Sequence, residues 1–322
     1  SDDNEKGFDP AQAIWLGPQG RLLAGASFQS LPDGSGRGLR TGTMRDAGTV
    51  AIAAERGYFV ADAGSVIDVS GVTRTLDVPQ GLTVTPTTVN GAAGTIDLLA
   101  AEGMVLNGEL RGAPGGGAGA AGGALNIALD PANRFTGTLK GGLQEYSTSS
   151  RDIVLSATQS VTPAVGDGVA DSLNGIVRLD PGKVAAGGFD QVTLRARSAS
   201  LDPTEARIVL EGDVQLAPAQ RLVLDAPVLE SDGGSAQLSA AYIRLGTPEN
   251  INPSAALPVS AGFGSLRVRG QQVDILGTLA LRGFGPGAGA TGTDDTAPVL
   301  IESDGDIRFI GGKRISDDGF HT

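Results

Sequence analysis

The stretch that decides the fold runs from Ala47 to Gly71 and reads AGTVAIAAERGYFVADAGSVIDVSG. It contains three short apolar runs rich in β-branched residues, at residues 50–52, 58–60 and 66–69. Each run is too short for a helix, and glycines, which adopt positive φ at little cost, separate the runs. The stretch therefore predicts three short strands joined by tight turns, making about one turn of a coiled chain.

The unit recurs further along the chain. Residues 94–106 align without a gap on residues 48–60, with glycine on glycine at 94/48 and 103/57, threonine on threonine, and coinciding apolar positions. A repeated strand–turn–strand unit is typical of a solenoid whose successive turns bury their inner faces against one another. An up-and-down barrel and a β-sandwich are the rival architectures. The same-sense repeat with glycines in register argues against the barrel, and the scarcity of Asn-Gly turn pairs, of which the chain has three, argues against the sandwich.

Apolar–polar–apolar runs continue to the end of the chain, and such alternation buries one face of a strand and leaves the other in water. They lie at residues 125–127, 153–155, 176–179, 192–194, 208–210, 222–224, 243–245, 266–268, 273–275, 279–281, 299–301 and 307–309. At roughly 20–25 residues a turn, the chain would make on the order of 13–16 turns. We expect an all-β protein, a right-handed parallel β-helix with loops or hairpins outside the coil.

Residues 1–322 are expected to form one β-helix segment of a longer protein. Several segments are expected to depart from the coil. These are 31–48, a loop that leaves it; 72–93, a less regular turn or an edge excursion; 111–123, a flexible Gly-rich corner; 128–172, a protruding loop or hairpin; 283–298, a second Gly-rich loop; and 312–322, a frayed tail. The only helix candidates, at 205–207 and 235–242, are short.

Composition excludes several classes of function. The 322 residues include 50 glycines, 4% aromatic residues and no cysteine, and the net charge is −12. The acidity argues against binding nucleic acid or anionic lipid, which need a positive face. The lack of cysteine excludes disulfides and thiolate metal sites. No apolar run is long enough to cross a bilayer as a helix, so we expect no membrane insertion.

Three motifs resemble a known family. They are Ile14-Trp-Leu-Gly-Pro18, Gly48-Thr-Val-Ala-Ile-Ala-Ala54 and Ala63-Gly-Ser-Val-Ile-Asp-Val-Ser-Gly71, and Gly94-Thr-Ile-Asp-Leu-Leu-Ala100 with the Gly/Ala corner after it is similar. Together they resemble the filamentous haemagglutinin family, large exoproteins of two-partner secretion in Gram-negative bacteria. The resemblance covers about residues 13–130 and fades into a general coil pattern beyond. The family's Asn-Pro-Asn secretion motif is absent, since the chain has only Asn252-Pro253-Ser254.

The resemblance implies a shaft or mid-body fragment of a secreted, outer-membrane-associated adhesin. It implies export through an outer-membrane transporter, and attachment to cell surfaces, other cells or the biofilm matrix, with a role in virulence. Side loops would contact exopolysaccharide or surface glycans, and we expect the segment itself to be a monomer. We do not expect an enzyme; the alternative is a β-helix polysaccharide lyase or hydrolase, and a third hypothesis is a passive capping or periplasm-facing export segment without a ligand.

The residues offer little for catalysis or cofactor binding. His321 is the single histidine and lies beside the terminus, which leaves no histidine for a nucleophilic or metal centre. The GxGxxG match at Gly117–Gly122 precedes an expected strand, whereas a dinucleotide loop opens a helix. Asp294-Asp295 and Asp304-Gly-Asp306 are paired carboxylates that suit turns better than glycosidic cleavage or a weak calcium site. We therefore assign no catalytic, cofactor-binding or metal-binding residue, and no cofactor.

Two groups of side chains are candidates for glycan contact. Arginines at exposed strand positions could stack into a ladder that grips an acidic glycan, although we favour solvated strand faces on which the arginines pair with nearby Asp and Glu. They are Arg178, Arg195, Arg197, Arg244, Arg267, Arg269 and Arg308. Aromatic rings could stack on sugars, namely Trp15, Tyr58, Phe59, Phe135 and Tyr146, but for Trp15 and Phe59 we favour packing in the core or at the end of the coil.

Overall fold

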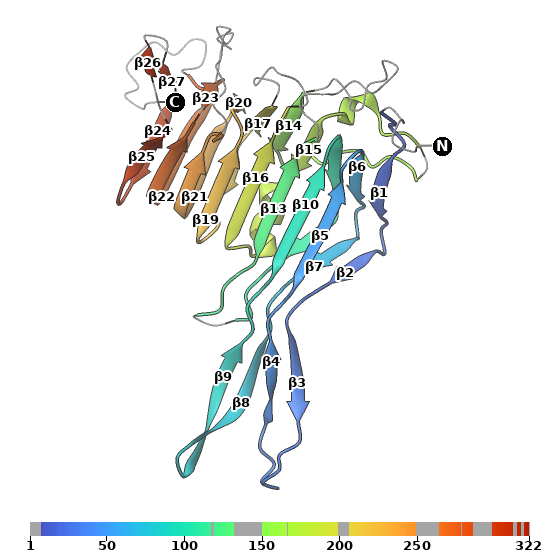
Figure 1. Cartoon of the computed structure of the whole chain (residues 1–322), viewed down its shortest axis with the longest axis vertical. Coiled ribbons are helices and arrows are strands. Elements are labelled where there is room, and N and C mark those ends of the chain that lie inside the picture. Colours follow the sequence, from blue (N-terminus) through green and yellow to red (C-terminus); the bar gives the residue numbers. More distant parts are fainter. Residues whose placement is uncertain are drawn as a thin grey trace.

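The computed structural model describes residues 8–116, 119–131, 150–165, 167–198, 206–248, 264–277, 279–285 and 298–311, together with the backbone of 314–316 and 319–321. The chain is all-β with long parallel sheets (Figure 1). Residues 132–149 of the expected protruding region and residues 286–297 of the second Gly-rich loop lie outside these residues, and so do Phe135, Tyr146, Asn252, Asp294 and Asp295.

The deciding stretch forms the three predicted strands, β5 (Thr49–Ala54), β6 (Tyr58–Ala61) and β7 (Val66–Asp68). The repeat forms three more, β10 (Thr95–Ala100), β11 (Gly103–Leu106) and β12 (Glu109–Arg111). Each strand of the second set pairs in parallel with its counterpart in the first. The chain therefore passes through three sheets in turn and then starts a new layer on top.

Two main sheets carry most of the structure, and each stacks eight strands along its path in the described residues. The first sheet runs β1 (Ala13–Leu16), β6, β11, β15 (Ile176–Leu179), β14 (Arg151–Leu155), β17 (Ala206–Glu211), β20 (Val228–Asp232), β23 (Ala280–Arg282). The second runs β5, β10, β13 (Ala124–Leu129), β16 (Gln191–Ala196), β19 (Arg221–Asp225), β21 (Ser235–Leu245), β22 (Ser265–Leu276), β24 (Val299–Ser303). Eight layers are fewer than the 13–16 expected, because long segments leave the stack.

The core follows from the alternation. In β10, Ile96, Leu98 and Ala100 point inward, and the residues stacked on them in the next layers are also apolar and buried. For example, Leu98 pairs with Ile127 of β13, which pairs with Leu194 of β16. The resulting apolar columns run along the stack and bury the inner faces of all three sheets.

The side of the stack that the two main sheets do not form is called the third face. It contains an interruption that the sequence did not predict. A sheet of β2 (Arg21–Leu23), β7 and β12 begins it, and β18 (Val214–Leu216) continues it by pairing with the first half of β21. Between β12 and β18 lies a short helix, α1 (Pro181–Gly187), which contacts both. The long strands β21 and β22 then bend from this face into the second sheet, where the second half of β22 pairs with β25 (Ile307–Ile310).

Helix α1 corrects our prediction of helices. Both sequence candidates are wrong: residues 235–242 lie in strand β21, and β17 begins at Ala206. The helix begins where Asp180 accepts a hydrogen bond from the Gly182 N–H, with Pro181 in its first turn, and ends at Gly188 with φ 72°. Asp before Pro and a closing Gly are the usual start and stop signals, so the sequence did carry the information.

Three other expectations change. The Gly-rich corner is packed in its described part, because a Cβ at Gly115 would lie 2.3 Å from the Val72 carbonyl oxygen. The tail contains an antiparallel pair, β26 (Arg314–Ser316) and β27 (Gly319–His321), where we expected fraying. Strand β14, which contains the expected apolar run 153–155, divides the expected protruding region 128–172 and lies between β15 and β17 of the first sheet.

Candidate functional site

Two β-hairpins project from the first layers of the stack and form the most distinctive feature of the molecule (Figure 1). The first arm pairs β3 (Ser27–Leu31) with β4 (Thr41–Arg45), and the second arm pairs β8 (Thr73–Gln80) with β9 (Thr83–Asn90). The sequence predicted that 31–48 leaves the coil, and the structure confirms this. It shows in addition that both excursions are antiparallel hairpins pointing the same way.

Arg40 and Asp77 join the two arms. The Arg40 guanidinium donates to both carboxylate oxygens of Asp77, with Nη2 2.7 Å from Oδ1 and Nε 3.2 Å from Oδ2. The Arg40 N–H donates to Asp77 Oδ2 at 2.8 Å, and the Asp77 N–H donates back to the Arg40 carbonyl at 2.9 Å. The hydrogen bonds from Arg40 hold the pKa of Asp77 below its usual range. This clamp sets how the arms lie against each other.

The arms have little core of their own. No residue of 27–46 or 73–90 is buried, and the inner apolar side chains, including Phe28, Met44 and Leu76, are only half-buried. Three large apolar residues lie exposed near the ends, since Leu31 is 44%, Val78 37% and Leu82 104% exposed. Single exposed apolar side chains are common on protein surfaces, so it is the projection of the arms that distinguishes them from the rest of the molecule.

The tip of the first arm is an ordered loop. Asp33 Oδ1 accepts from the Ser35 N–H at 2.9 Å and from the Ser35 hydroxyl at 2.6 Å, while Oδ2 accepts from the Leu39 N–H at 3.0 Å. These hydrogen bonds, first the one from the Ser35 hydroxyl, hold the pKa of Asp33 far below its usual range. The carboxylate is thereby committed to its own loop, and Arg37 remains exposed beside it.

A groove of about 750 Å³ lies beside α1, where the third face is interrupted. Its apolar lining includes Val184, Phe189 and Leu216, and three aspartates line it as well, namely Asp180, Asp190 and Asp213. Phe189 is 5% exposed and lies against Gly112 and Gly187, where any side chain would strike its ring.

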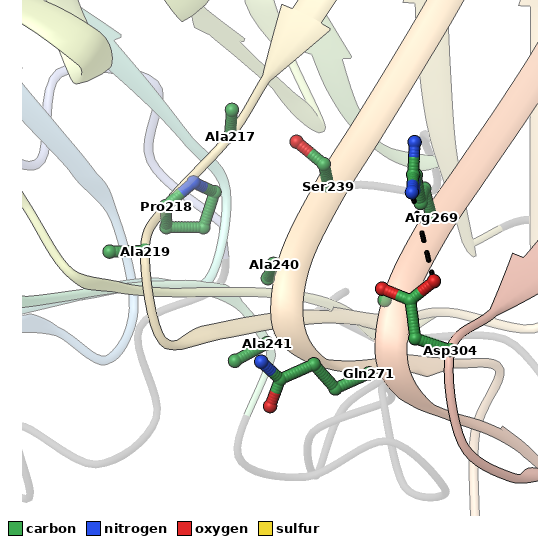
Figure 2. Close-up of a pocket in the computed structure, with 10 residues that line it drawn as sticks. Ala217, Pro218, Ala219, Ser239, Ala240, Ala241, Arg269, Gln271 and Asp304 are labelled. Atoms are coloured by element: carbon green, nitrogen blue, oxygen red, sulfur yellow. Dashed lines mark ion pairs between the residues drawn. The ribbon is translucent and has the colours of Figure 1, made fainter.

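A second, shallower hollow of about 340 Å³ follows the bend of β21 and β22 (Figure 2). Small residues line it, and it meets the first groove at Ala217–Ala219. At its far end Arg269 and Asp304 form an exposed ion pair, with Nη2 3.7 Å from Oδ1 (Figure 2). The small side chains make it a consequence of the bend rather than a specific site.

The predicted arginine ladder is mostly a set of ion pairs. Arg178 pairs with Glu211, Arg195 with Asp130, Arg197 and Arg244 with Asp225, Arg269 with Asp304, and Arg308 with Asp274. No ion pair joins Arg267 to another residue of the described ranges. Arg207, which the sequence analysis did not single out, bridges Asp152 and Glu230 across neighbouring strands. These arginines join successive layers rather than present a free cationic stripe.

Arginines hold two carboxylates of the strands in their ionised form. Hydrogen bonds from Arg308 lower the pKa of Asp274, and those from Arg178 lower the pKa of Glu211. Lowered pKa values favour ionised carboxylates, whereas a general acid needs a raised one. Asp304 is bound to Arg269 as described. Among the described residues, no three Asp, Glu or His side chains gather as a metal site would require.

The aromatic residues considered for sugar stacking differ in how exposed they are. Tyr58 and Phe59 are buried, so neither ring is available to a sugar. Trp15 is half-buried in β1, with its Nε1–H donating to Asp62 Oδ2 at 2.9 Å. His321 lies in β27, where its backbone is paired with Arg314. The GxGxxG segment ends before strand β13, as expected of a corner.

Comparison with known proteins adds no relative: no family model, no curated protein and no solved structure matches the chain. A search of the described helices also found none that is long and apolar enough to cross a membrane. The arms and the groove beside α1 therefore have to be interpreted from their own geometry.

Proposed function

We propose that the chain is an adhesive segment of a secreted, filamentous haemagglutinin-like surface protein. In this proposal the stacked layers form a right-handed parallel β-helix that serves as a shaft, and an outer-membrane partner exports the protein. The two arms carry the contact with a surface glycan, a neighbouring cell or the biofilm matrix. The segment does not act as an enzyme.

The observation that carries the proposal is the pair of projecting arms. A hairpin without a buried residue contributes little to its own stability, and an isolated hairpin is marginal in water. The chain nevertheless devotes two long segments to such hairpins and clamps them together through Arg40 and Asp77. A passive shaft has no need of them, whereas an adhesive segment needs a surface that stands clear of the shaft.

The stack suits the mechanical part of this function. Ion pairs such as Arg207 with Asp152 and Glu230 cross from strand to strand along the shaft. They stiffen the outer face, while the apolar columns hold the inside. A bending force would have to break many parallel contacts at once, so the shaft can hold the arms at a fixed distance.

The test compares the whole chain with a variant in which short turns replace residues 28–44 and 74–89. Both are applied to a glycan array that includes bacterial exopolysaccharides, and hydrolysis products are assayed in the same wells. Saturable binding by the chain and its loss in the armless variant support the proposal. Binding that survives removal of the arms would place adhesion elsewhere, and cleavage products would favour the polysaccharide lyase or hydrolase instead.

A point variant refines the test, with a matched control. Leu82→Ser removes the fully exposed apolar side chain at the end of the second arm, and Val161→Ser changes a residue that is 82% exposed elsewhere. We expect Leu82→Ser to weaken binding severalfold and Val161→Ser to leave it unchanged. Circular dichroism should show the same fold for both, because neither residue is buried.

A further inference from the structure

The groove beside α1 is acidic as well as apolar. Asp180, Asp190 and Asp213 line it, and none of its lining residues is Lys or Arg. Lys183, on the same helix, is turned to another partner, since its Nζ donates to the Asn107 carbonyl at 2.8 Å. A ligand that fits this groove therefore combines a positive charge with apolar surface.

The three aspartates are held in position by the fold. Asp180 Oδ1 accepts from the Gly182 N–H, and Asp213 Oδ1 accepts from the Ser235 N–H at 2.9 Å. Asp190 Oδ2 accepts from the Gly122 N–H at 2.7 Å. One oxygen of each carboxylate is used in this way, so the negative charges are fixed beside the groove before any partner arrives.

The first arm has the complementary character. Residues 27–45 contain Arg37, Arg40 and Arg45 but only one acid, Asp33, so their net charge is 3 − 1 = +2 in a chain of −12. Arg40 is engaged by Asp77, and Asp33 is engaged by its own loop. Arg37 is exposed at the tip, and no carboxylate within the described residues pairs with it. Leu31 adds exposed apolar surface at the same tip.

The tip of the first arm lies away from the groove of its own chain. Figure 1 shows the arms pointing away from the sheets, whereas α1 lies within the body between β12 and β18. The geometry points to an intermolecular contact: we propose that the tip loop of the first arm, residues 32–39, docks into the groove beside α1 of a second copy, with Arg37 facing the aspartates. This goes beyond the proposed function, because it concerns contact between copies and needs no glycan.

The contact is expected to be weak and reversible. One loop in one groove buries less than the roughly 1,200 Å² of a stable interface, so dilute chains remain the monomers expected from the sequence. An arm that enters a different surface makes a heterologous contact, which can continue from copy to copy. The charges involved are exposed, so salt should screen them. On a crowded surface, such contacts would join neighbouring shafts side by side.

Sedimentation velocity of the whole chain tests this, run over a wide range of concentrations at low salt and again at about 0.5 M salt, where screening is strong. We expect concentration-dependent association that weakens at least about tenfold in high salt. Arg37→Glu should weaken it similarly, and so should Gln215→Arg, which places a positive charge on an exposed residue lining the groove. Arg21→Glu is the control, because it makes the same charge change on an exposed residue away from the arms.

The decisive step mixes the two impaired variants. The Arg37 tip of the Gln215→Arg chain should enter the unchanged acidic groove of the Arg37→Glu chain, so the mixture should recover association that neither variant shows alone. A wild-type chain that stays monomeric throughout, a mixture that fails to recover, or an Arg21→Glu effect as large as that of Arg37→Glu would each overturn the inference. If Gln215→Arg melts at a lower temperature, Ala185→Lys places the charge on an exposed residue of α1 instead.

Discussion

Arg151 and Glu102 form a fully buried ion pair, with Nη2 3.1 Å from Oε2 and both side chains 0% exposed. Arg151 begins β14, Glu102 immediately precedes β11, and β15 lies between these two strands in the first sheet. The Gly175 N–H, just before β15, donates to the Glu102 carbonyl at 2.6 Å. The pair thus spans the position that β15, a strand later in the sequence than β14, comes to occupy.

Removing one partner of this pair should be costly. Arg151→Met removes the guanidinium from a buried carboxylate, and breaking a buried ion pair from one side costs about 3–5 kcal/mol. Chemical denaturation should show this loss, with the Arg151→Met/Glu102→Leu double variant markedly more stable than the single one. Arg221→Met, at an exposed position of β19, is the control. Equal stability of all the variants would show that the pair is not needed to order these strands.

Two glycines at equivalent positions of the repeat should respond differently to alanine. A Cβ at Gly94 would lie 1.8 Å from the Gly48 carbonyl oxygen, whereas a Cβ at Gly48 would lie at ordinary contact distances, 3.7 Å from the Ala24 Cβ and 3.8 Å from the Ala24 carbonyl oxygen. Gly94→Ala should therefore force apart β5 and β10 and lower the melting temperature clearly, while Gly48→Ala changes it little. A thermal melt of each variant decides this, and a similar loss in both would contradict the stacking described for this layer.

The clamp between the arms should depend on pH. Because Arg40 lowers the pKa of Asp77, the pairing contributes fully above the ordinary aspartate pKa of about 4 and is lost as pH falls through the lowered value. The chain has no cysteine, so Gly34→Cys and Leu82→Cys allow two labels to report the distance between the arms. We expect the mean distance between the labels to lengthen, or the distribution of distances to broaden, as the pH falls.

The same labels on an Asp77→Asn variant give the control for the clamp. This variant should show the acid-like distance distribution already at neutral pH and little further change on acidification. An unchanged distance in both proteins at every pH would show that the arms are held together by something other than this ion pair.

The packing of α1 against the neighbouring strands should depend on the ring of Phe189. A Cβ at Gly112 would lie 2.3 Å from that ring, so Gly112→Ala should destabilise the protein by displacing it. Phe189→Ala removes the ring and should cost about 3–5 kcal/mol, as large-to-small changes in a core do. Combining Gly112→Ala with Phe189→Leu should recover part of the loss, because the smaller side chain leaves room. A strictly additive double variant in denaturation experiments would contradict this contact.

The ungapped repeat illustrates how far a sequence pattern reaches. It places residues 94–100 on 48–54, and β10 pairs with β5 in that register, with Thr95 opposite Thr49. In the next pair of strands, β6 and β11, the register differs from the sequence alignment by one residue. The alignment places Tyr58 on Met104, but Tyr58 pairs with Gly103. Three residues separate β5 from β6, but only two separate β10 from β11. The shorter turn shifts the strand so that Met104 falls opposite Phe59 and both face the core.

The arms and the groove beside α1 likewise combine features that the sequence predicts with features that only the tertiary structure decides. Arg37, Arg40 and Asp77 are ordinary polar residues of two segments that the sequence marks as loops. Nothing local indicates that these segments form two hairpins lying side by side, joined by an ion pair between Arg40 and Asp77, which are 37 residues apart. The predicted arginines occupy outward strand positions, as alternation requires, but their carboxylate partners come from other layers. The turn signals around α1 were present in Asp180, Pro181 and Gly188, and the expectation of a purely β chain concealed them.

The sequence by itself determined the strands, the faces they bury and the points where the chain leaves the stack. Alternation and glycine turns are local features, and burial of every second side chain follows from them without knowledge of the partner strand. The tertiary structure alone decided the register between β6 and β11, the place of β15 between β11 and β14, and the clamp between the arms. Those features depend on contacts between residues far apart in the chain, where the relative free energies of alternative pairings, and no local pattern, choose the outcome.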